Sequence, residues 1–469
     1  MNTKNSFNTN KFSLNIIRFL IVLLIYSSSL KIDTIFTVSN WKIYFFILFI
    51  WFLIEMNLGV NNKESYLTFF FCFGLIKFFL VLFSQNFDSS IFYSAPDSIP
   101  LRDLGKTIFE CFEYSRSCGG DPYFQRGPSY SILISIFTLG TKISALFLML
   151  IQIFLFAYIN AGIIKKIDSN NNWVTAAIFI LLTIYPSIAT FSRIVLYEIW
   201  GVFCLFLAWK FSDLETTEKK YYIYYLLLLS FSIYLQIQYF LVIFLFFLKF
   251  SFLNKYNLKH IFTGILIPII LIISWGFRNE THLGYWDFNP YSGCYLERNI
   301  IEPTEALKRG VSNNEIRTSR ETLVLIGRET KPSNLNDVEI CKEFLDIMPS
   351  YYIENFETIF ENYKIFISKF FTDHLTCQYE EIGCESGYWF FIINKLFNYL
   401  LIVCLLCFPF LLNKKELINF LIFASLLVLI TALVTIDVPR MRISIDIYLF
   451  YLVGVTLNKI EFFYNQKRK

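Results

Sequence analysis

The chain has 469 residues, of which 55% are hydrophobic and 20% aromatic, and its formal net charge is +4. A mean hydropathy of +0.52 leaves too little polar surface for a water-soluble protein of this length. Its apolar runs approach the roughly 20 residues that a bilayer-spanning helix needs. Basic residues stand at the ends of these runs rather than in a stripe, which gives nucleic-acid binding no support. The composition predicts an all-α polytopic membrane protein.

The first apolar runs predict an N-terminal hairpin of two spans, near 12–30 and 41–59, within residues 1–65. The first run lacks the small-residue cleavage site of a signal peptide, so we expect it to be retained as a helix. Flanking lysines favour a cytoplasmic N-terminus. A third span near 66–84 then brings the chain to the outer side of the membrane.

A long polar interval at 85–144 predicts the first outer loop. Within it, a short amphipathic helix lying on the membrane is expected to start near Pro100, because apolar residues follow at helical spacing. These residues are Leu101, Leu104, Ile108 and Phe112. The apolar segment 129–139 has only about eleven residues. It is too short to cross a bilayer, so we place it in the loop as well.

The membrane core is predicted to continue to residue 277, which makes 66–277 one unit. The stretch Tyr221–Phe250 is too long for one helix, and Gln236 and Gln238 mark its middle, so we expect a hairpin of two short spans. Other spans of this unit lie near 145–164, 173–190, 194–211 and 260–277.

Residues 278–388 form the only sizeable hydrophilic block and predict a small, mostly helical extracytoplasmic domain, with helical periodicity over Val338–Phe371. Residues 389–469 supply the last spans and a basic tail. These spans lie near 389–411, 416–435 and 441–458. The total is about twelve spans with both termini inside. The chain shows no internal repeat of the kind that marks many transporters.

Six of the ten cysteines fall in predicted outer loops, and none falls in a predicted cytoplasmic loop. An even number on one side indicates disulfide bonds in an oxidising compartment, with separate buried thiols as the alternative. The expected pairs are Cys111–Cys118, Cys377–Cys384 and, by remainder, Cys294–Cys341.

Asp97 is the leading catalytic candidate, because it immediately precedes the predicted amphipathic helix. A carboxylate at the membrane surface can serve as general base for an acceptor hydroxyl or amine, although capping the helix is a common alternative use. Asp103 would lie on the opposite, solvated face and is assigned to substrate binding. Arg126, next to Gly127 and Pro128, is suited to bind an anion or to mark the interface.

Glu198 is the second catalytic candidate and stands with Arg193 in the second outer turn, IYPSIATFSRIVLYEIW. Ionisable groups in such apolar surroundings are costly and favour the bundle interior or a cavity. They can contact substrate, or they can pair with each other and only fix the turn.

Arg440 and Arg442 lie at the outer mouth of the last span. Guanidinium forks suit phosphate oxygens, and snorkelling at the membrane surface is the alternative. The sequence contains no P-loop, no dinucleotide-binding glycine motif, no nucleophile elbow and no His/Cys metal spacing. No metal ligand is therefore assigned.

Five short motifs follow one another along the chain: PDSIPLRDLG, QRGPSYSILISI, IYPSIATFSRIVLYEIWGVF, WGFRNETHLGYWDF and VPRMRISIDIYLF. In order and sidedness they resemble the motifs of membrane glycosyltransferases of the GT-C type. The chain after about residue 66 resembles the dolichyl-phosphate-mannose protein mannosyltransferases (family 39) and the lipid A aminoarabinose transferases. It departs from them at Ser98, where a second acid is usual, at Gly127-Pro128 in place of two prolines, and in its extra hairpin at 12–59.

The resemblance implies a sugar donor carried on a polyprenyl phosphate, and an acceptor that is a lipid, a glycan or a protein. Asp97 would deprotonate the acceptor as it attacks the anomeric carbon, which inverts that centre. Arg278, Arg440 and Arg442 would stabilise the departing phosphate. Tyr130, in the second motif, joins the expected substrate contacts. No cofactor is identified, and a divalent metal stays open.

Two other functions stay open. A polysaccharide polymerase or ligase would use a diphosphate-linked oligosaccharide and depend on outer-loop arginine and histidine. A lipid or sugar transporter would show repeated halves and broken helices that meet at mid-membrane. We expect a multi-pass protein among the lipids of a bacterial inner (plasma) membrane, with its active site facing the periplasm.

Overall fold

The computed structural model describes residues 18, 50, 52, 53, 55, 65–84, 98–124, 127–138, 142–167, 172–184, 197–216, 218–311, 316, 337–372, 398, 399, 402, 403, 406, 414–433 and 438–467. Most of them are helical, and this part of the chain contains no β-strand, only a β-bridge between Ser115 and Pro122. The all-α class predicted from the sequence is confirmed.

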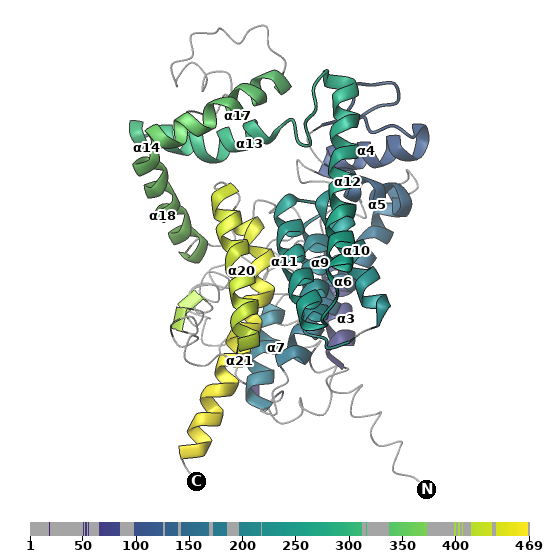
Figure 1. The fold of residues 1–469 in the computed structure, drawn as a ribbon. Coiled ribbons are helices and arrows are strands. Elements are labelled where there is room, and N and C mark those ends of the chain that lie inside the picture. Colours follow the sequence, from purple (N-terminus) through teal and green to yellow (C-terminus); the bar gives the residue numbers. More distant parts are fainter. Residues whose placement is uncertain are drawn as a thin grey trace.

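A bundle of apolar helices forms the body of the protein (Figure 1). Its members are α3 (Ser65–Ser84), α6 (Lys142–Ile167), α7 (Asn172–Ile184), α9 (Glu198–Ser212), α10 (Lys219–Ile233), α11 (Ile237–Leu253), α12 (Leu258–Leu283), α20 (Lys414–Leu433) and α21 (Val438–Lys467). Two short helices, α4 (Ser98–Cys111) and α5 (Ser129–Thr138), cover one end of the bundle.

A block of short helices, here called the helical block, lies at the same end of the bundle (Figure 1). It contains α13 (Ser292–Leu296), the π-helix η4 (Glu297–Ile301), α14 (Glu302–Arg309), α17 (Asp337–Glu354) and α18 (Phe356–Thr372). A disulfide bond between Cys294 and Cys341 joins α13 to α17. The two helices cross so closely that a Cβ atom at position 293 would lie 1.7 Å from the Cys341 carbonyl oxygen, so only Gly293 fits.

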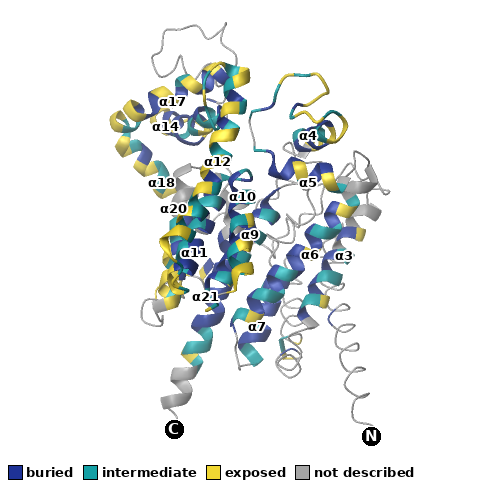
Figure 2. Ribbon diagram, turned by 45° about the vertical axis from the view of Figure 1, so that its right-hand side comes forward, coloured by how far each residue is buried: buried dark blue, intermediate teal, exposed yellow. Residues whose placement is uncertain are grey.

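Aromatic rings and one close helix crossing organise the bundle core. α3 packs along α6, and Gly74 permits this because a Cβ atom there would lie 2.5 Å from Ile153 Cγ2. The rings of Phe70 and Phe156 meet edge to face at 5.9 Å beside this crossing. Such a ring pair contributes about 0.5–1.5 kcal/mol beyond its buried area. α6 is correspondingly buried along most of its length (Figure 2).

The predicted helix break within Tyr221–Phe250 is confirmed, because α10 ends at Ile233 and α11 begins at Ile237. Gln236 stands before α11 with an extended backbone, at φ −160° and ψ 137°. The two helices contact each other, and α10 also contacts α12.

α4 has the predicted amphipathic character over most of its length. Leu101 and Leu104 are buried, and the helix packs on α5. The prediction for Phe112 is wrong, because this residue leaves the helix with a φ of 58° and is 92% exposed. α4 ends at Cys111, whose disulfide bond to Cys118 turns the chain back.

Two predicted boundaries differ from those of the structure. α12 continues past Arg278 to Leu283 and ends where Gly284 takes the left-handed conformation, at φ 77°. The predicted helical stretch Val338–Phe371 is two helices, α17 and α18, separated at Asn355.

Two helices in the described part of the chain are long and apolar enough to cross a membrane. They are Leu146–Ile167 in α6 and Leu258–Leu283, which is α12. Shorter apolar helices occur at Tyr66–Ile76, Asn172–Thr183 and Gln238–Leu253. With ten residues, α5 is about 15 Å long, half of the roughly 30 Å hydrocarbon core. The total of about twelve spans stays a prediction.

One end of the bundle, here called the lysine end, is tied together by lysines around Asp213. Lys249 Nζ lies 2.5 Å from Asp213 Oδ1, and Lys166 forms an ion pair with Asp213 Oδ2. Lys415 Nζ donates to the Asp213 carbonyl oxygen at 3.0 Å. Burial raises the pKa of Asp213, but the nearby lysines outweigh this and hold the pKa below its usual value. The residues involved come from α6, α11, α20 and the end of α9.

The opposite end, here called the loop end, carries α4, α5 and the loop 112–124. α9 connects the two ends: Tyr197, just before it, contacts Tyr130 of α5, with ring centroids 6.4 Å apart, and Asp213 follows it directly. With 15 residues, α9 separates these contacts by roughly 22 Å. The loop end and the helical block therefore hold the disulfides, while the lysine cluster lies at the other end.

The helical block should loosen in acid because of Glu305. Burial raises the pKa of this carboxyl, but hydrogen bonds from Lys308 and Tyr351 lower it by more, so the pKa lies below its usual value. The resulting stability is present above the ordinary glutamate pKa of about 4.3 and is lost as pH falls through the lowered value. Hydrogen exchange in α14 and α17, corrected for intrinsic rates, should therefore accelerate in that range. In Glu305→Gln the acceleration should be smaller, and equal acceleration in both proteins would contradict the assignment.

Candidate functional site

The structure describes part of the predicted site. Outside the described residues lie Asp97, Arg126, Arg193, Cys377 and Cys384. Arg440 and Arg442 lie near the start of α21, where the backbone but not the side chains is described. α18 of the helical block contacts α21. The remaining predicted residues are Asp103, Tyr130, Glu198, Arg278 and four cysteines.

α4 rests on α5 through one close contact. A Cβ atom at Gly105 would lie 2.4 Å from Ile134 Cγ2, so a glycine is required for this approach. On the outward side, Asp103 accepts hydrogen bonds from Arg102 Nε and Nη2 at 2.9 and 2.8 Å. The side chain of Asp103 is 32% exposed. The predicted solvated face is thus observed, and the carboxylate proposed to bind substrate is paired with its neighbour.

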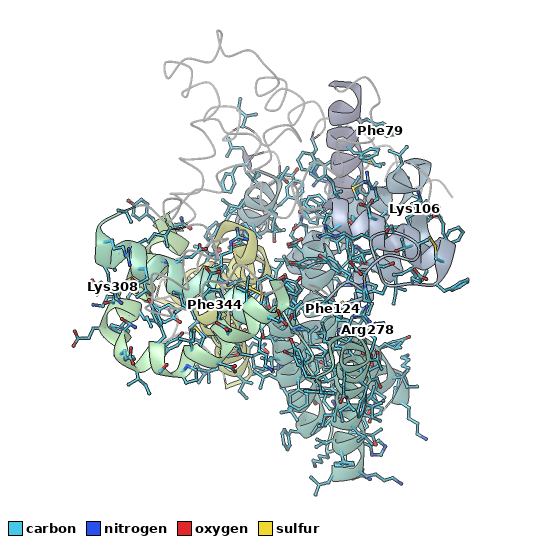
Figure 3. The ribbon with its side chains drawn as sticks, turned by 90° about the horizontal axis from the view of Figure 1, so that it is seen from above. Phe79, Lys106, Phe124, Arg278, Lys308 and Phe344 are labelled. Atoms are coloured by element: carbon cyan, nitrogen blue, oxygen red, sulfur yellow. A yellow bond between two sulfur atoms is a disulfide. The ribbon has the colours of Figure 1, made fainter. Side chains whose placement is uncertain are left out.

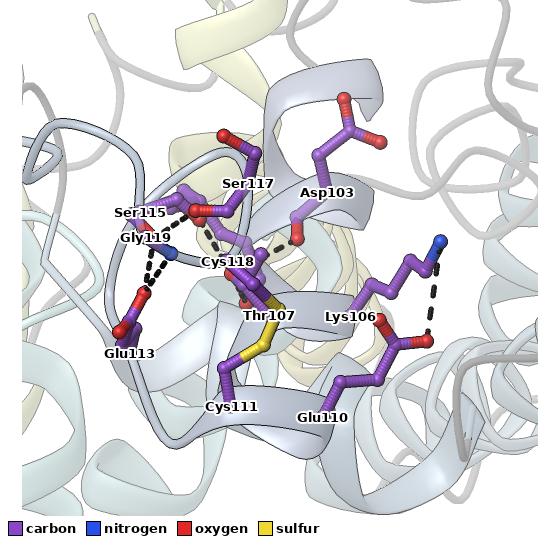
Figure 4. The surroundings of a disulfide bond; sticks show 11 residues. Asp103, Lys106, Thr107, Glu110, Cys111, Glu113, Ser115, Ser117, Cys118 and Gly119 are labelled. Atoms are coloured by element: carbon purple, nitrogen blue, oxygen red, sulfur yellow. Dashed lines mark hydrogen bonds and ion pairs between the residues drawn. A yellow bond between two sulfur atoms is a disulfide. The ribbon is translucent and has the colours of Figure 1, made fainter.

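A disulfide bond closes the loop that follows α4 (Figure 4). It joins Cys111 to Cys118, whose Cα atoms are 5.8 Å apart, and it is one of the pairs predicted from the sequence. Inside the loop, the Glu113 carboxylate accepts a hydrogen bond from the Gly119 amide at 2.7 Å. The loop therefore has a fixed shape before it reaches α5.

No metal site is built at this disulfide. Among the described residues, Glu110, Cys111 and Cys118 form the one group of ligand atoms close enough together to hold a metal ion. The two sulfur atoms are bonded to each other, so neither is a thiolate ligand. The Glu110 carboxylate lies 3.9 Å from Lys106 Nζ. These residues do not fit a metal ion.

Arg278 fixes the loop to α12. Its Nη1 and Nη2 donate to the carbonyl oxygens of Tyr123 and Tyr114, at 3.0 and 3.2 Å. Its guanidinium carbon lies 5.1 Å from the ring centroid of Phe124 and 4.8 Å from that of Trp275 (Figure 3). The fork that was predicted to bind phosphate is directed at backbone carbonyls.

A layer of buried and half-buried amide and aromatic side chains, here called the amide layer, lies where α5 meets the bundle. Its members are Tyr130, Gln152, Tyr197, Trp200, Gln236 and Gln238. The Tyr130 hydroxyl donates to Gln152 Oε1 at 2.8 Å, and Trp200 Nε1 donates to the same oxygen at 3.4 Å. These contacts join α5, α6 and α9. Tyr130 is only 2% exposed, so the predicted substrate contact lies inside the bundle.

The amide layer continues from α9 to α11. Gln236 Nε2 donates to the Tyr197 hydroxyl at 2.5 Å, and Gln238 Nε2 donates to Gln236 Oε1 at 2.6 Å. Glu198 directly follows Tyr197, as the first residue of α9, and is completely buried. An acid in this position complements the positive end of the helix dipole. The structure thus brings Tyr130 and Glu198, two of the predicted site residues, into one buried region.

α5 starts at a tight contact with the α10–α11 break. A Cβ atom at Gly127 would lie 2.4 Å from the carbonyl oxygen of Tyr234. The Ser129 hydroxyl donates to the Phe231 carbonyl oxygen at 2.9 Å, and the Tyr114 hydroxyl donates to that of Gly127 at 3.0 Å. The segment next to Arg126 is therefore held where the amide layer reaches α11.

Gly127→Ala should displace the start of α5. The clashing atom belongs to the backbone and cannot rotate away, so we expect a loss of about 1–3 kcal/mol in the free energy of unfolding. Thermal unfolding of the purified full-length protein measures this loss. Ser129→Ala, which removes one hydrogen bond worth about 0.5–1.5 kcal/mol, is the matched control. An unfolding temperature of Gly127→Ala equal to wild type would contradict the close contact.

Sequence reasoning missed most of the amide layer. Gln236 and Gln238 were used only to locate a helix break, and Gln152 was not singled out. A glutamine within an apolar helix is costly in lipid, which is the signal that could have found it. The ion pair between Arg18 and Glu55 was missed as well. Both side chains are completely buried, and two hydrogen bonds of 2.5 and 2.6 Å join them.

Comparison of the chain with protein-family models, with curated proteins and with solved structures finds no match.

Proposed function

We propose that the protein is a membrane glycosyltransferase of GT-C type, which moves a sugar from a polyprenyl-phosphate donor to an acceptor at the extracytoplasmic face. The observation that carries the proposal is the chemical difference between the two ends of an apolar bundle. A buried acid, the amide layer and a disulfide-closed loop lie at one end, and a lysine cluster lies at the other. Lysine excess is typical of the cytoplasmic side, and disulfides are typical of the outer side.

The exposed face of α12 supports a lipid environment. Only 17% of an apolar 18-residue stretch of α12 is buried inside the protein. Seven exposed residues of the helix are large and apolar. They are Leu258, Phe262, Leu266, Ile269, Ile270, Ile273 and Phe277. In water, a contiguous apolar face of this size would promote association. A lipid-linked donor could enter sideways from the bilayer along such a face, so no nucleotide pocket is required.

In the proposed reaction, an acceptor oxygen or nitrogen forms a bond to the anomeric carbon of the sugar. The bond from that carbon to the phosphate oxygen breaks, the proton of the acceptor goes to Asp97, and the configuration inverts. Arg440 and Arg442 would bind the phosphate as its charge grows, with Arg126 and Arg193 as further candidates.

Glu198 and the amide layer fit the sugar part of this substrate. Uncharged amide and aromatic groups are suited to hydroxyl groups and to the apolar faces of a ring, and a few placed polar groups set specificity. Glu198 would be the second acid at the site. The hydrogen bond between Gln236 and Tyr197, which directly precedes Glu198, would hold the start of α9 in place.

Donor preference tests the proposal against its competitors. Purified protein should transfer sugar from a polyprenyl-monophosphate donor and not from a diphosphate-linked oligosaccharide. Use of the diphosphate donor alone would favour a polysaccharide polymerase or ligase. Uptake of free sugar into proteoliposomes without any transfer would favour a transporter. Either of these outcomes would overturn the proposal.

A further inference from the structure

Two neighbouring residues in the last turns of α12 contact different parts of the loop end. Arg278 holds the loop 112–124 through the carbonyl oxygens of Tyr114 and Tyr123. Its guanidinium carbon also lies 5.5 Å from the Tyr114 ring centroid. Hydrogen bonds and ring contacts of the guanidinium group thus fix the loop that the Cys111–Cys118 disulfide closes.

Asn279 holds the segment that leads into the helical block. It is completely buried, and its Nδ2 donates to the carbonyl oxygens of Asp287 and Phe288 at 2.7 and 3.4 Å. Its Oδ1 accepts a hydrogen bond from Arg278 Nη1 at 2.9 Å. A continuous chain of hydrogen bonds therefore runs from the loop to the segment before α13.

We propose that Arg278 is a positioning residue rather than a phosphate ligand, and that Arg278 and Asn279 couple the loop 112–124 to the helical block. The guanidinium group donates to neutral carbonyl oxygens of the loop. These hydrogen bonds fix the position of the loop and, through the loop, the position of α4. The purpose of this coupling rests on the proposed function: an acceptor bound by the helical block would set the position of α4, which directly follows Asp97.

The Cys111–Cys118 disulfide reports on the loop without any substrate. Cys118 is exposed, so a glutathione buffer can exchange with the disulfide in the full-length protein. Loosening the loop lowers the effective concentration of one thiol near the other, which shifts the equilibrium toward the dithiol. The Cys294–Cys341 disulfide reports on the helical block in the same sample.

Arg278→Ala should shift the Cys111–Cys118 equilibrium toward the dithiol by about tenfold, the scale of a lost charge-assisted hydrogen bond. The Cys294–Cys341 equilibrium should shift by less, because Arg278 is connected to the segment before α13 through Asn279. Arg278→Lys should shift the Cys111–Cys118 equilibrium nearly as far as Arg278→Ala does, because an ammonium group cannot reproduce the planar fork between two carbonyls. An unchanged Cys111–Cys118 equilibrium in Arg278→Ala would overturn the positioning role.

Asn279→Ala tests the coupling, because the hydrogen bonds of the Asn279 side chain join Arg278 to Asp287 and Phe288. A shift of about threefold at Cys111–Cys118 is expected from the partial loss of one Arg278 contact. Ser274→Ala is the matched control, since the Ser274 hydroxyl bonds only to the Ile270 carbonyl oxygen of its own helix. Equal equilibria in Asn279→Ala and Ser274→Ala would overturn the coupling. These measurements need no donor, so an absence of sugar transfer would count against the proposed function alone.

Discussion

Asp97→Asn is expected to reduce sugar transfer by about 10²–10⁴-fold, the usual scale of a positioned general acid or base. The substitution keeps the size of the side chain and removes its basic site. Residue 97 directly precedes α4, and Asn and Asp cap helices about equally well, so a loss of capping is largely excluded. Initial rates with the polyprenyl-phosphate donor, together with thermal unfolding, measure the two effects separately.

Asp103→Asn is the matched control for this variant. Asp103 lies in α4, the helix that follows residue 97, but its carboxylate pairs with Arg102 and is partly exposed. Exposed pairs of this kind are worth about 0–1 kcal/mol, so transfer and unfolding should stay close to wild type. If Asp97→Asn transfers sugar at the wild-type rate, the general base has been assigned wrongly.

Glu198→Gln is expected to reduce transfer by about 10²-fold or more, because it removes the acid from a site that excludes water. The side chain of Glu198 is completely buried at the start of α9, and Gln preserves its volume. Gln also still accepts and donates hydrogen bonds, so the protein should keep its fold. Transfer should therefore fall in a protein that still unfolds cooperatively on heating.

Glu110→Gln is the control for charge at the loop end, since Glu110 is exposed and pairs with Lys106 at 3.9 Å. It should retain full transfer. If Glu198→Gln transfers sugar at the wild-type rate, Glu198 has a structural role and not a catalytic one. Loss of transfer in Glu198→Gln, with a normal rate in Asp97→Asn, would move the general base to the second outer turn.

Local pattern was enough to predict most of the helices. Apolar run length predicted α3 and α6, and two glutamines located the break between α10 and α11. The short run at 129–139 was correctly kept apart from the longer apolar helices. Each of these predictions depends on residues close together in sequence, which is the range over which hydrophobic periodicity carries information.

The contacts that build the loop end could not be predicted in the same way. Arg278 and Tyr123 are 155 residues apart, and Ser129 and Phe231 are 102 apart. A single sequence gives no signal for pairs at such separations. Arg278 was assigned to phosphate binding because of its residue type. In the structure its guanidinium group donates to backbone carbonyl oxygens, which every residue has, so the sequence gives no sign of this contact. Phe112 fitted the apolar spacing of the predicted amphipathic helix. In the structure this helix ends one residue earlier, at Cys111, which forms the disulfide bond with Cys118.

Product analysis with the purified protein in proteoliposomes tests the central claim most directly. The polyprenyl phosphate released and the sugar attached to the acceptor are counted together, and the anomeric configuration of the product is determined. We predict one polyprenyl phosphate released for each sugar transferred, with inversion of configuration. Free sugar accumulating inside the vesicles, with no polyprenyl phosphate released and no glycosidic product formed, would contradict the account.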